Sequence, residues 1–173
     1  MKKLAAALFI LFSIQTASLF AQDEKGIVLQ IGFNTTGSEF VFWEDNTYGG
    51  NIQMIYEVVR FAGDASALGI KASGLFADGM TGGYAGINLR VDELFFVDFD
   101  AMLGYSSIDN PNLLQSYDIG TIEYKDLAGI FGIGIGYRFQ ENPLHVRLAY
   151  ALHLPLSNNG LNTGLNIQLG YRF

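Results

Sequence analysis

The last ten residues, Gly164 to Phe173, read GLNIQLGYRF and alternate between two kinds of side chain. The apolar and aromatic set, taken backwards from the terminus, is Phe173, Tyr171, Leu169, Ile167 and Leu165, and the polar or small set between them is Arg172, Gly170, Gln168, Asn166 and Gly164. A period of two places such sets on opposite faces of a β-strand. The stretch therefore predicts a strand between an apolar and a polar environment, with an aromatic ring as its final residue.

Seven earlier stretches repeat this alternation between clusters of turn residues. In chain order they read GIVLQIGFN, NIQMIYEVV, ALGIKASGLF, YAGINLRV, FFVDFDAMLGY, LAGIFGIGIGYRF and LHVRLAYALHL. Connections two, four and six are predicted to be short, around AGDAS, DEL and QENP. The first and third are predicted to be long, at TTGSEFVFWEDNT and SSIDNPNLLQSYDIGTIE. The expected fold class is all-β: a transmembrane up-and-down antiparallel β-barrel of eight strands, closed so that every backbone group is paired.

The N-terminus predicts export. Lys2 and Lys3 precede the apolar run LAAALFILF, which is too short to span a bilayer as a helix. This pattern is typical of a secretory signal peptide, expected over residues 1–21 with cleavage at or near Ala21, and leaves residues 22–173 as one outer-membrane β-barrel domain. An uncleaved anchor is the alternative, disfavoured by the length of the run. The chain contains no cysteine, so a disulfide, a thiolate metal site and a lipidated N-terminal cysteine are excluded.

Composition supports short membrane-facing strands. The chain is 50% hydrophobic and 14% aromatic with 16% charged residues, yet no run after the signal reaches the length of a membrane-spanning helix. The formal net charge is −7, and nucleic acid is excluded as a partner because phosphate binding needs a basic patch.

A soluble eight-stranded barrel of the lipocalin type would show the same alternation with its apolar face inward. Two observations favour the membrane barrel. The polar face is largely Gly, Ala and Asn rather than the Lys, Glu and Thr expected of a water-facing surface. Bulky aromatics fall beside the short turns, where an interfacial girdle belongs; they are Phe95, Tyr137, Phe139, Tyr171 and Phe173.

These strands and the terminal LGYRF resemble the small eight-stranded outer-membrane barrels, typified by OmpX-like proteins and the barrel domain of OmpA-like proteins of the porin family. The resemblance covers the whole predicted mature chain. It implies that Phe173, with Tyr171 and Leu169, forms the signal that the outer-membrane assembly machinery recognises. OmpA-like proteins continue into a peptidoglycan-binding domain, and this sequence has none, so attachment to the cell wall is not implied.

Charged residues within the alternating stretches fall on the polar face. A barrel of eight strands has an interior only wide enough for side chains, so these residues are expected to form a charge network in the lumen rather than line a pore. The expected network consists of Glu57, Lys71, Arg90, Asp98, Asp100, Arg138, Arg147 and Arg172.

Catalysis is not expected. The two histidines, His145 and His153, lie on the same inward face, and the missing constellation of nucleophile and base favours a packing role. Lipid A deacylases of this architecture resemble one another in a lipid-facing His-x-Ser pair, which neither HVR nor HLP matches. No cofactor is expected, and metal ligation by a histidine with Asp98 or Asp100 is unsupported by the spacing.

The first long connection contains Phe40, Phe42 and Trp43 among acidic residues. These aromatics could contact an extracellular ligand of unknown identity, or they could belong to extensions of the first two strands, which the alternation favours. The sequence therefore predicts an integral outer-membrane protein of a Gram-negative-type envelope, with outer-membrane lipid as its surroundings and a structural or surface-interaction role for acidic loops. The alternatives are a narrow solute channel, a surface adhesin and, less favoured, a lipid-modifying enzyme.

Overall fold

The computed structural model describes residues 26–37, 47–61, 66–91, 94–110, 113, 124–140, 142–156 and 161–173. The expected signal peptide, residues 1–21, lies outside these ranges, as do Phe40, Phe42 and Trp43. Within the described part, no helix is long and apolar enough to cross a membrane.

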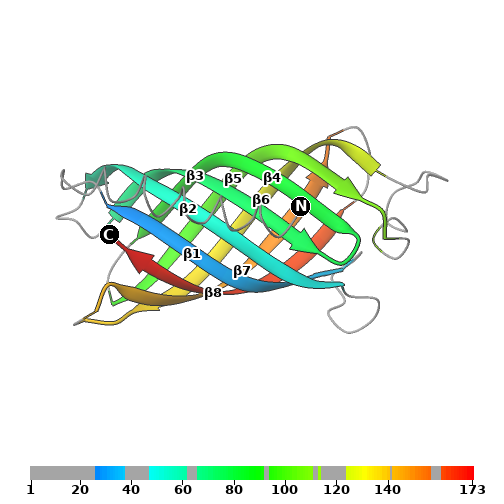
Figure 1. Cartoon of the computed structure of the whole chain (residues 1–173). Helices are drawn as coiled ribbons and strands as arrows, with labels where there is room; N and C mark the ends of the chain where they lie inside the picture. Colours follow the sequence, from blue (N-terminus) through cyan, green and yellow to red (C-terminus); the bar gives the residue numbers. More distant parts are fainter. Residues whose placement is uncertain are drawn as a thin grey trace.

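Eight antiparallel strands form a closed barrel in which each strand pairs with its neighbours in sequence and the last pairs with the first (Figure 1). The strands are β1 (Ile27–Gly37), β2 (Thr47–Phe61), β3 (Ser66–Ala77), β4 (Met80–Val91), β5 (Phe95–Ile108), β6 (Tyr124–Arg138), β7 (Leu144–Pro155) and β8 (Asn162–Arg172). The predicted eight-stranded up-and-down barrel is confirmed. Closure leaves no strand edge unpaired.

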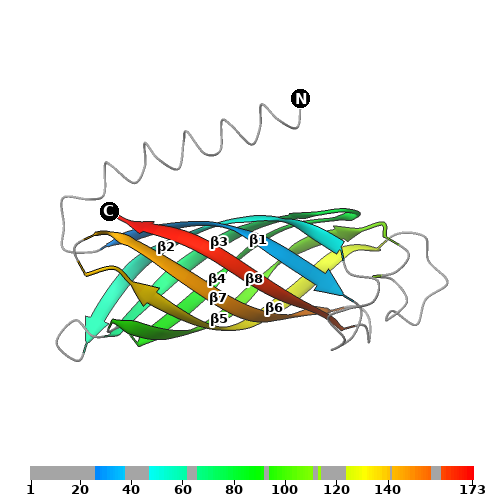
Figure 2. The same ribbon diagram turned by 90° about the horizontal axis from the view of Figure 1, so that it is seen from below.

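The two ends of the barrel differ in their connections. The short β2–β3, β4–β5 and β6–β7 connections lie at the end where the chain terminates, hereafter the terminal end, and the opposite end is the long-loop end (Figure 2). The prediction that the third connection is long is wrong, because β3 and β4 are joined by the two-residue turn Asp78–Gly79. Gly79 has φ +68°, a left-handed conformation that a tight hairpin turn favours. The stretch SSIDNPNLLQSYDIGTIE begins with residues 106–108 at the end of β5 and then contains the fifth connection.

The outer surface of the barrel is apolar. Alternate residues of every strand point outward, and large apolar side chains there are exposed; examples are Ile31, Ile87, Phe99, Leu103, Ile133, Leu148 and Ile167. In a sheet the side chains alternate between faces, so the polar partners of these residues point into the lumen. The apolar residues of the alternating stretches therefore face the outside of the barrel, as the sequence predicts.

Strand β2 contains a β-bulge that the sequence pattern did not predict. The pairing of β2 with β3 shifts between Glu57 and Val59, so Val58 is the extra residue. A bulge reverses the facing of all residues that follow it. As a result, Val59 and Phe61 face outward and Arg60 is brought back to the Glu57 side chain.

Candidate functional site

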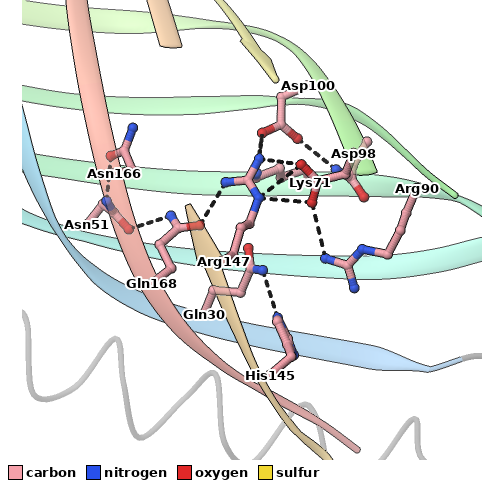
Figure 3. Close-up of polar contacts among 11 residues, drawn as sticks. Gln30, Asn51, Lys71, Arg90, Asp98, Asp100, His145, Arg147, Asn166 and Gln168 are labelled. Carbon is pink, nitrogen blue, oxygen red and sulfur yellow. Dashed lines mark hydrogen bonds and ion pairs between the residues drawn. The ribbon is translucent and has the colours of Figure 1, made fainter. Parts of the chain in front are cut away.

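The lumen holds a buried ion cluster, hereafter the central ion cluster, formed by Lys71, Arg90, Asp98, Asp100 and Arg147 (Figure 3). The guanidinium of Arg147 donates from Nε to both oxygens of Asp98 at 2.9 Å and from Nη2 to Asp100 at 2.8 Å. Lys71 Nζ lies 2.7 Å from the same Asp100 oxygen, Oδ2, and Arg90 Nη2 lies 3.4 Å from Asp98. All five side chains are almost completely buried.

Strand register brings these residues together. Asp98 of β5 lies opposite Arg90 of β4 and, on its other side, opposite Gly134 of β6. A Cβ atom at Gly134 would lie 2.5 Å from Arg147 Nε and from Asp98 Oδ1. The missing side chain at Gly134 therefore provides the space in which the guanidinium from β7 reaches the carboxylate from β5.

A second ion group lies at the terminal end. Glu57 Oε2 accepts from Arg60 Nη2 and from Arg172 Nη2, with separations of 2.5 and 2.8 Å. Glu57 is buried, whereas the two arginines are partly exposed. Because Arg172 is in β8 and the other two are in β2, this group joins strands on both sides of β1.

Among the described residues, the charges predicted to form a lumen network are arranged in two groups. Seven of the eight predicted members belong to them: five form the central ion cluster, and Glu57 and Arg172 form the terminal group with Arg60. Arg138 lies opposite His145 in the pairing of β6 with β7 and is not placed in either group by these ion pairs. Its position near the end of β6 leaves it partly exposed.

An apolar and aromatic layer separates the central ion cluster from the terminal end. The Phe96 ring lies beneath Arg90, whose Cζ is 4.4 Å from the ring centroid, and packs edge-on against the His145 imidazole at 5.5 Å. His145 Nε2 is 2.9 Å from Gln30 Nε2, a hydrogen bond in which the imidazole nitrogen accepts (Figure 3). Val28 and Ile55 are also fully buried in this half of the lumen.

A chain of side-chain amides runs from the central ion cluster toward the long-loop end. Arg147 Nη1 donates to Gln168 Oε1 at 2.7 Å, Gln168 Nε2 donates to Asn51 Oδ1 at 2.8 Å, and Asn51 Nδ2 donates to Asn166 Oδ1 at 2.8 Å (Figure 3). An arginine can only donate, so it fixes the orientation of each amide in turn. This amide chain links β7, β8 and β2 across the lumen.

Both histidines make packing and hydrogen-bond contacts in the lumen. His153 Nε2 is 2.9 Å from the Tyr84 hydroxyl and His145 contacts Gln30 and Phe96, so neither imidazole contacts a serine or a carboxylate through these bonds. No group of three or more His, Cys, Asp or Glu in the described part of the chain could hold a metal ion. Both histidines are nevertheless buried on the inward face, as the alternation predicts.

The C-terminal strand places its aromatic residues on the outer surface at the terminal end. Leu169, Tyr171 and Phe173 are all exposed, and the rings of Tyr171 and Phe173 are 4.7 Å apart. The Phe173 amide donates to the Ile27 carbonyl at 2.9 Å. Phe173 is therefore the last residue to pair with β1. The role of these three residues in assembly stays a prediction.

Sequence reasoning missed three contributors to the lumen. Arg60 was missed because a strict period of two places it outward, and only the bulge brings it to Glu57. Phe96 shares the inward face of Asp98 by alternation, but an inward aromatic carries no distinctive signal. The partners of Gln168 were missed because amide pairing across β2, β7 and β8 depends on the register of strands distant in sequence.

No protein-family model and no curated protein matches the sequence. Solved structures do match, over nearly the whole barrel. The crystal structure of Ail, the attachment invasion locus protein of Yersinia pestis, in complex with the heparin analogue sucrose octasulfate, is 15% identical with a TM-score of 0.53 and covers 87% of this chain and 100% of that one. The outer membrane protein OprG from Pseudomonas aeruginosa is 10% identical with a TM-score of 0.53, covering 86% and 96%.

The N-terminal β-barrel domain of Pseudomonas aeruginosa OprF is 16% identical, with a TM-score of 0.50, and the match covers 87% of this chain and 98% of that domain. The expected resemblance to small eight-stranded outer-membrane barrels is confirmed at the level of the fold. At these identities the likeness extends to the fold alone.

Glycines that face the lumen make room for the buried side chains, and this gives a testable contrast. A Cβ at Gly170 would overlap the His145 imidazole, which is itself held by Gln30 and Phe96. Gly83 instead lies on the outward face of β4, opposite Tyr105, and a Cβ there meets nothing within 4 Å. We expect Gly170→Ala to lower the free energy of unfolding by about 1–3 kcal/mol, the usual cost of overpacking. Gly83→Ala should be neutral or slightly stabilising.

Chemical denaturation of both variants in detergent micelles measures this contrast. Equal stability of the two variants would show that the His145 side of the lumen has unfilled space, contrary to the packing described here.

Proposed function

We propose that the protein is an integral outer-membrane β-barrel, not an enzyme, whose closed lumen makes it a rigid support for loops at the cell surface. The observation that carries the proposal is the combination of an apolar outer surface with a buried ion-paired interior. A water-soluble protein rarely exposes a continuous apolar surface of this extent. Such a surface is suited to contact with membrane lipid.

The dimensions of the apolar surface support this proposal. On β5, the outward residues run from Phe95 at the terminal end to Tyr105 near the long-loop end. Ten residues of strand extend about 33 Å, which at a tilt of about 45° corresponds to about 23 Å along the membrane normal. The apolar band of outer-membrane barrels is about 25 Å tall.

Aromatic rings border this band at both ends. At the terminal end the exposed rings are Phe61, Phe95, Phe139, Tyr171 and Phe173; toward the long-loop end they are Phe33, Tyr48, Phe76 and Tyr105. Aromatic girdles of this kind lie at the two interfaces of membrane barrels. Their positions support an orientation with the terminal end in the periplasm and the long loops outside.

The interior supports a structural or surface-interaction role over the alternative of a solute channel. Arg147 pairs with Asp98 and Asp100 of β5, which also pair with Arg90 of β4 and Lys71 of β3, so the cluster crosses the lumen. Phe96 with its neighbours fills the next layer. Ions would have to separate buried ion pairs to pass. The resemblance to Ail, an attachment protein by name, leaves a surface adhesin as a possible form of the surface role, with the aromatic residues Phe40, Phe42 and Trp43 as candidates for contact with a ligand.

Planar-bilayer recording tests the proposal. We expect purified protein to insert into the bilayer without stable single-channel currents of porin size, because the central ion cluster closes the lumen. A shift in electrophoretic mobility on heating, typical of folded barrels, serves as the control for folding. Stable currents from folded protein would overturn the closed lumen and favour the solute channel.

A further inference from the structure

A cavity lies in the lumen between the central ion cluster and the long-loop end. Its volume is about 50 Å³, and Asp100 and Arg147 form its floor. A polar cavity needs roughly 10–15 Å³ to hold one water molecule, so the space fits a few water molecules or one small solute. Neither the ion pairing nor the packing of the terminal half uses this cavity.

The cavity has walls of two kinds. One wall is polar and comes from β1, β2 and β8, with Asn34, Asn51, Gln53 and Asn166; the facing wall is apolar and includes Leu75, Met102 and Ile130. Polar groups on one side and apolar groups on the other are typical of sites that orient a small ligand.

Some buried polar atoms on the lining residues have no hydrogen-bond partner among the described residues. They are Asn34 Oδ1, Gln53 Oε1 and His153 Nδ1, on side chains that are 1%, 7% and 4% exposed. A buried polar atom without a partner is costly, and nearly all such atoms in folded proteins find one. The two amide oxygens can only accept, so they require a donor in the cavity.

The amide chain places a hydrogen-bond donor on the same polar wall. Because Arg147 orients Gln168, Asn51 and then Asn166, the chain ends on the Asn166 amide nitrogen, which is a donor. Hydrogen bonds in a chain polarise one another, so the donor at its end is strengthened by the guanidinium charge. The cavity thus combines acceptors with a polarised donor.

A charged ligand does not fit this combination. A cation would lie close to Arg147, and an anion would lie close to Asp100 and the two amide oxygens. A neutral molecule that both donates and accepts hydrogen bonds satisfies every one of these groups.

We propose that this cavity is a binding chamber for small uncharged molecules that both donate and accept hydrogen bonds, either water or an amide- or hydroxyl-bearing solute of a few atoms. The inference goes beyond the proposed function and does not depend on it, because the chamber is defined by residues inside the barrel. The terminal side of the chamber is closed by the central ion cluster, so the chamber is a blind pocket and not part of a passage.

Nuclear magnetic resonance of the full chain in micelles tests the chamber. Cross-relaxation with water should appear at the side-chain amides of Asn51 and Asn166 and should be absent at Asn88, a matched buried amide that donates to Asp100 and does not line the cavity. Titration with acetamide distinguishes the two sources: saturable shifts confined to the chamber amides identify the solute, and water contacts without saturation identify water. Both results support the chamber. The absence of both water contacts and acetamide-induced shifts at these amides would overturn the proposal.

Gln53→Met gives an independent readout, because methionine matches glutamine in shape and removes its polar atoms. If a ligand or water satisfies Gln53 Oε1, the variant should unfold at a lower temperature than the wild type and lose part of the chamber signals. A rise in the unfolding temperature would mean that the carbonyl is unsatisfied in a dry cavity, which contradicts the proposal.

Discussion

Replacement of Asp98 by Ala should lower the free energy of unfolding by about 3–5 kcal/mol, the usual cost of removing one partner of a buried ion pair. Asp98 accepts from Arg147 and pairs with Arg90, and its side chain is fully buried. The central ion cluster holds three cationic and two anionic side chains. The substitution leaves one anion, Asp100, for all three cations.

Equilibrium unfolding in micelles measures this loss. Asp109→Ala is the matched control, because Asp109 follows the same strand and is exposed at the long-loop end; it should change stability little. If the two variants prove equally stable, water must reach the central ion cluster and screen its charges.

Deletion of Phe173 should strongly reduce the amount of protein in the outer membrane of growing cells and leave refolding in micelles nearly intact. The ring is 39% exposed on the outer surface, and the residue adds one backbone hydrogen bond to Ile27. Its apolar burial in an interface contributes about 2 kcal/mol, too little to unfold a closed barrel. A defect confined to cells would therefore reflect recognition of the C-terminal strand, as the resemblance to small outer-membrane barrels implies.

Phe173→Tyr is the control for the deletion, because it keeps the ring at the same position. It should reach the outer membrane at near wild-type levels, measured by immunoblotting of membrane fractions. Normal recovery of the truncated chain would remove Phe173 from the assembly signal and leave it a packing role.

The fold was predictable because each strand carries its own signal. The period of two assigns outward residues such as Leu103 and Ile133 without knowledge of their neighbours, and both are exposed on the outer surface. The inward position of the charged residues follows from the same rule. The hairpin at Asp78–Gly79 was missed because the surrounding glycines obscure where β3 ends and β4 begins.

The partners within the lumen were less predictable, because they depend on register between strands. The sequence placed Asp98 and the arginines in the lumen without assigning pairs, and the structure pairs Asp98 with Arg147 and Arg90. The bulge that returns Arg60 to Glu57 has no local sequence mark. The amide chain and the cavity beside it arise from side chains that meet only when the barrel closes.

The most direct test of a lipid-facing outer surface is the cost of a charge placed on it. Ile133 and Leu127 are outward residues of the same strand, β6, and are 47% and 53% exposed; Leu127 lies opposite Tyr105, at the level of the aromatic rings. In denaturant titrations of the protein folded into lipid bilayers, Ile133→Arg should cost about 2–4 kcal/mol and Leu127→Arg about 0–1 kcal/mol, because the penalty for a charge is greatest at the bilayer centre. Equally small penalties at the two positions would mean that the outer surface faces water, and would contradict the membrane barrel.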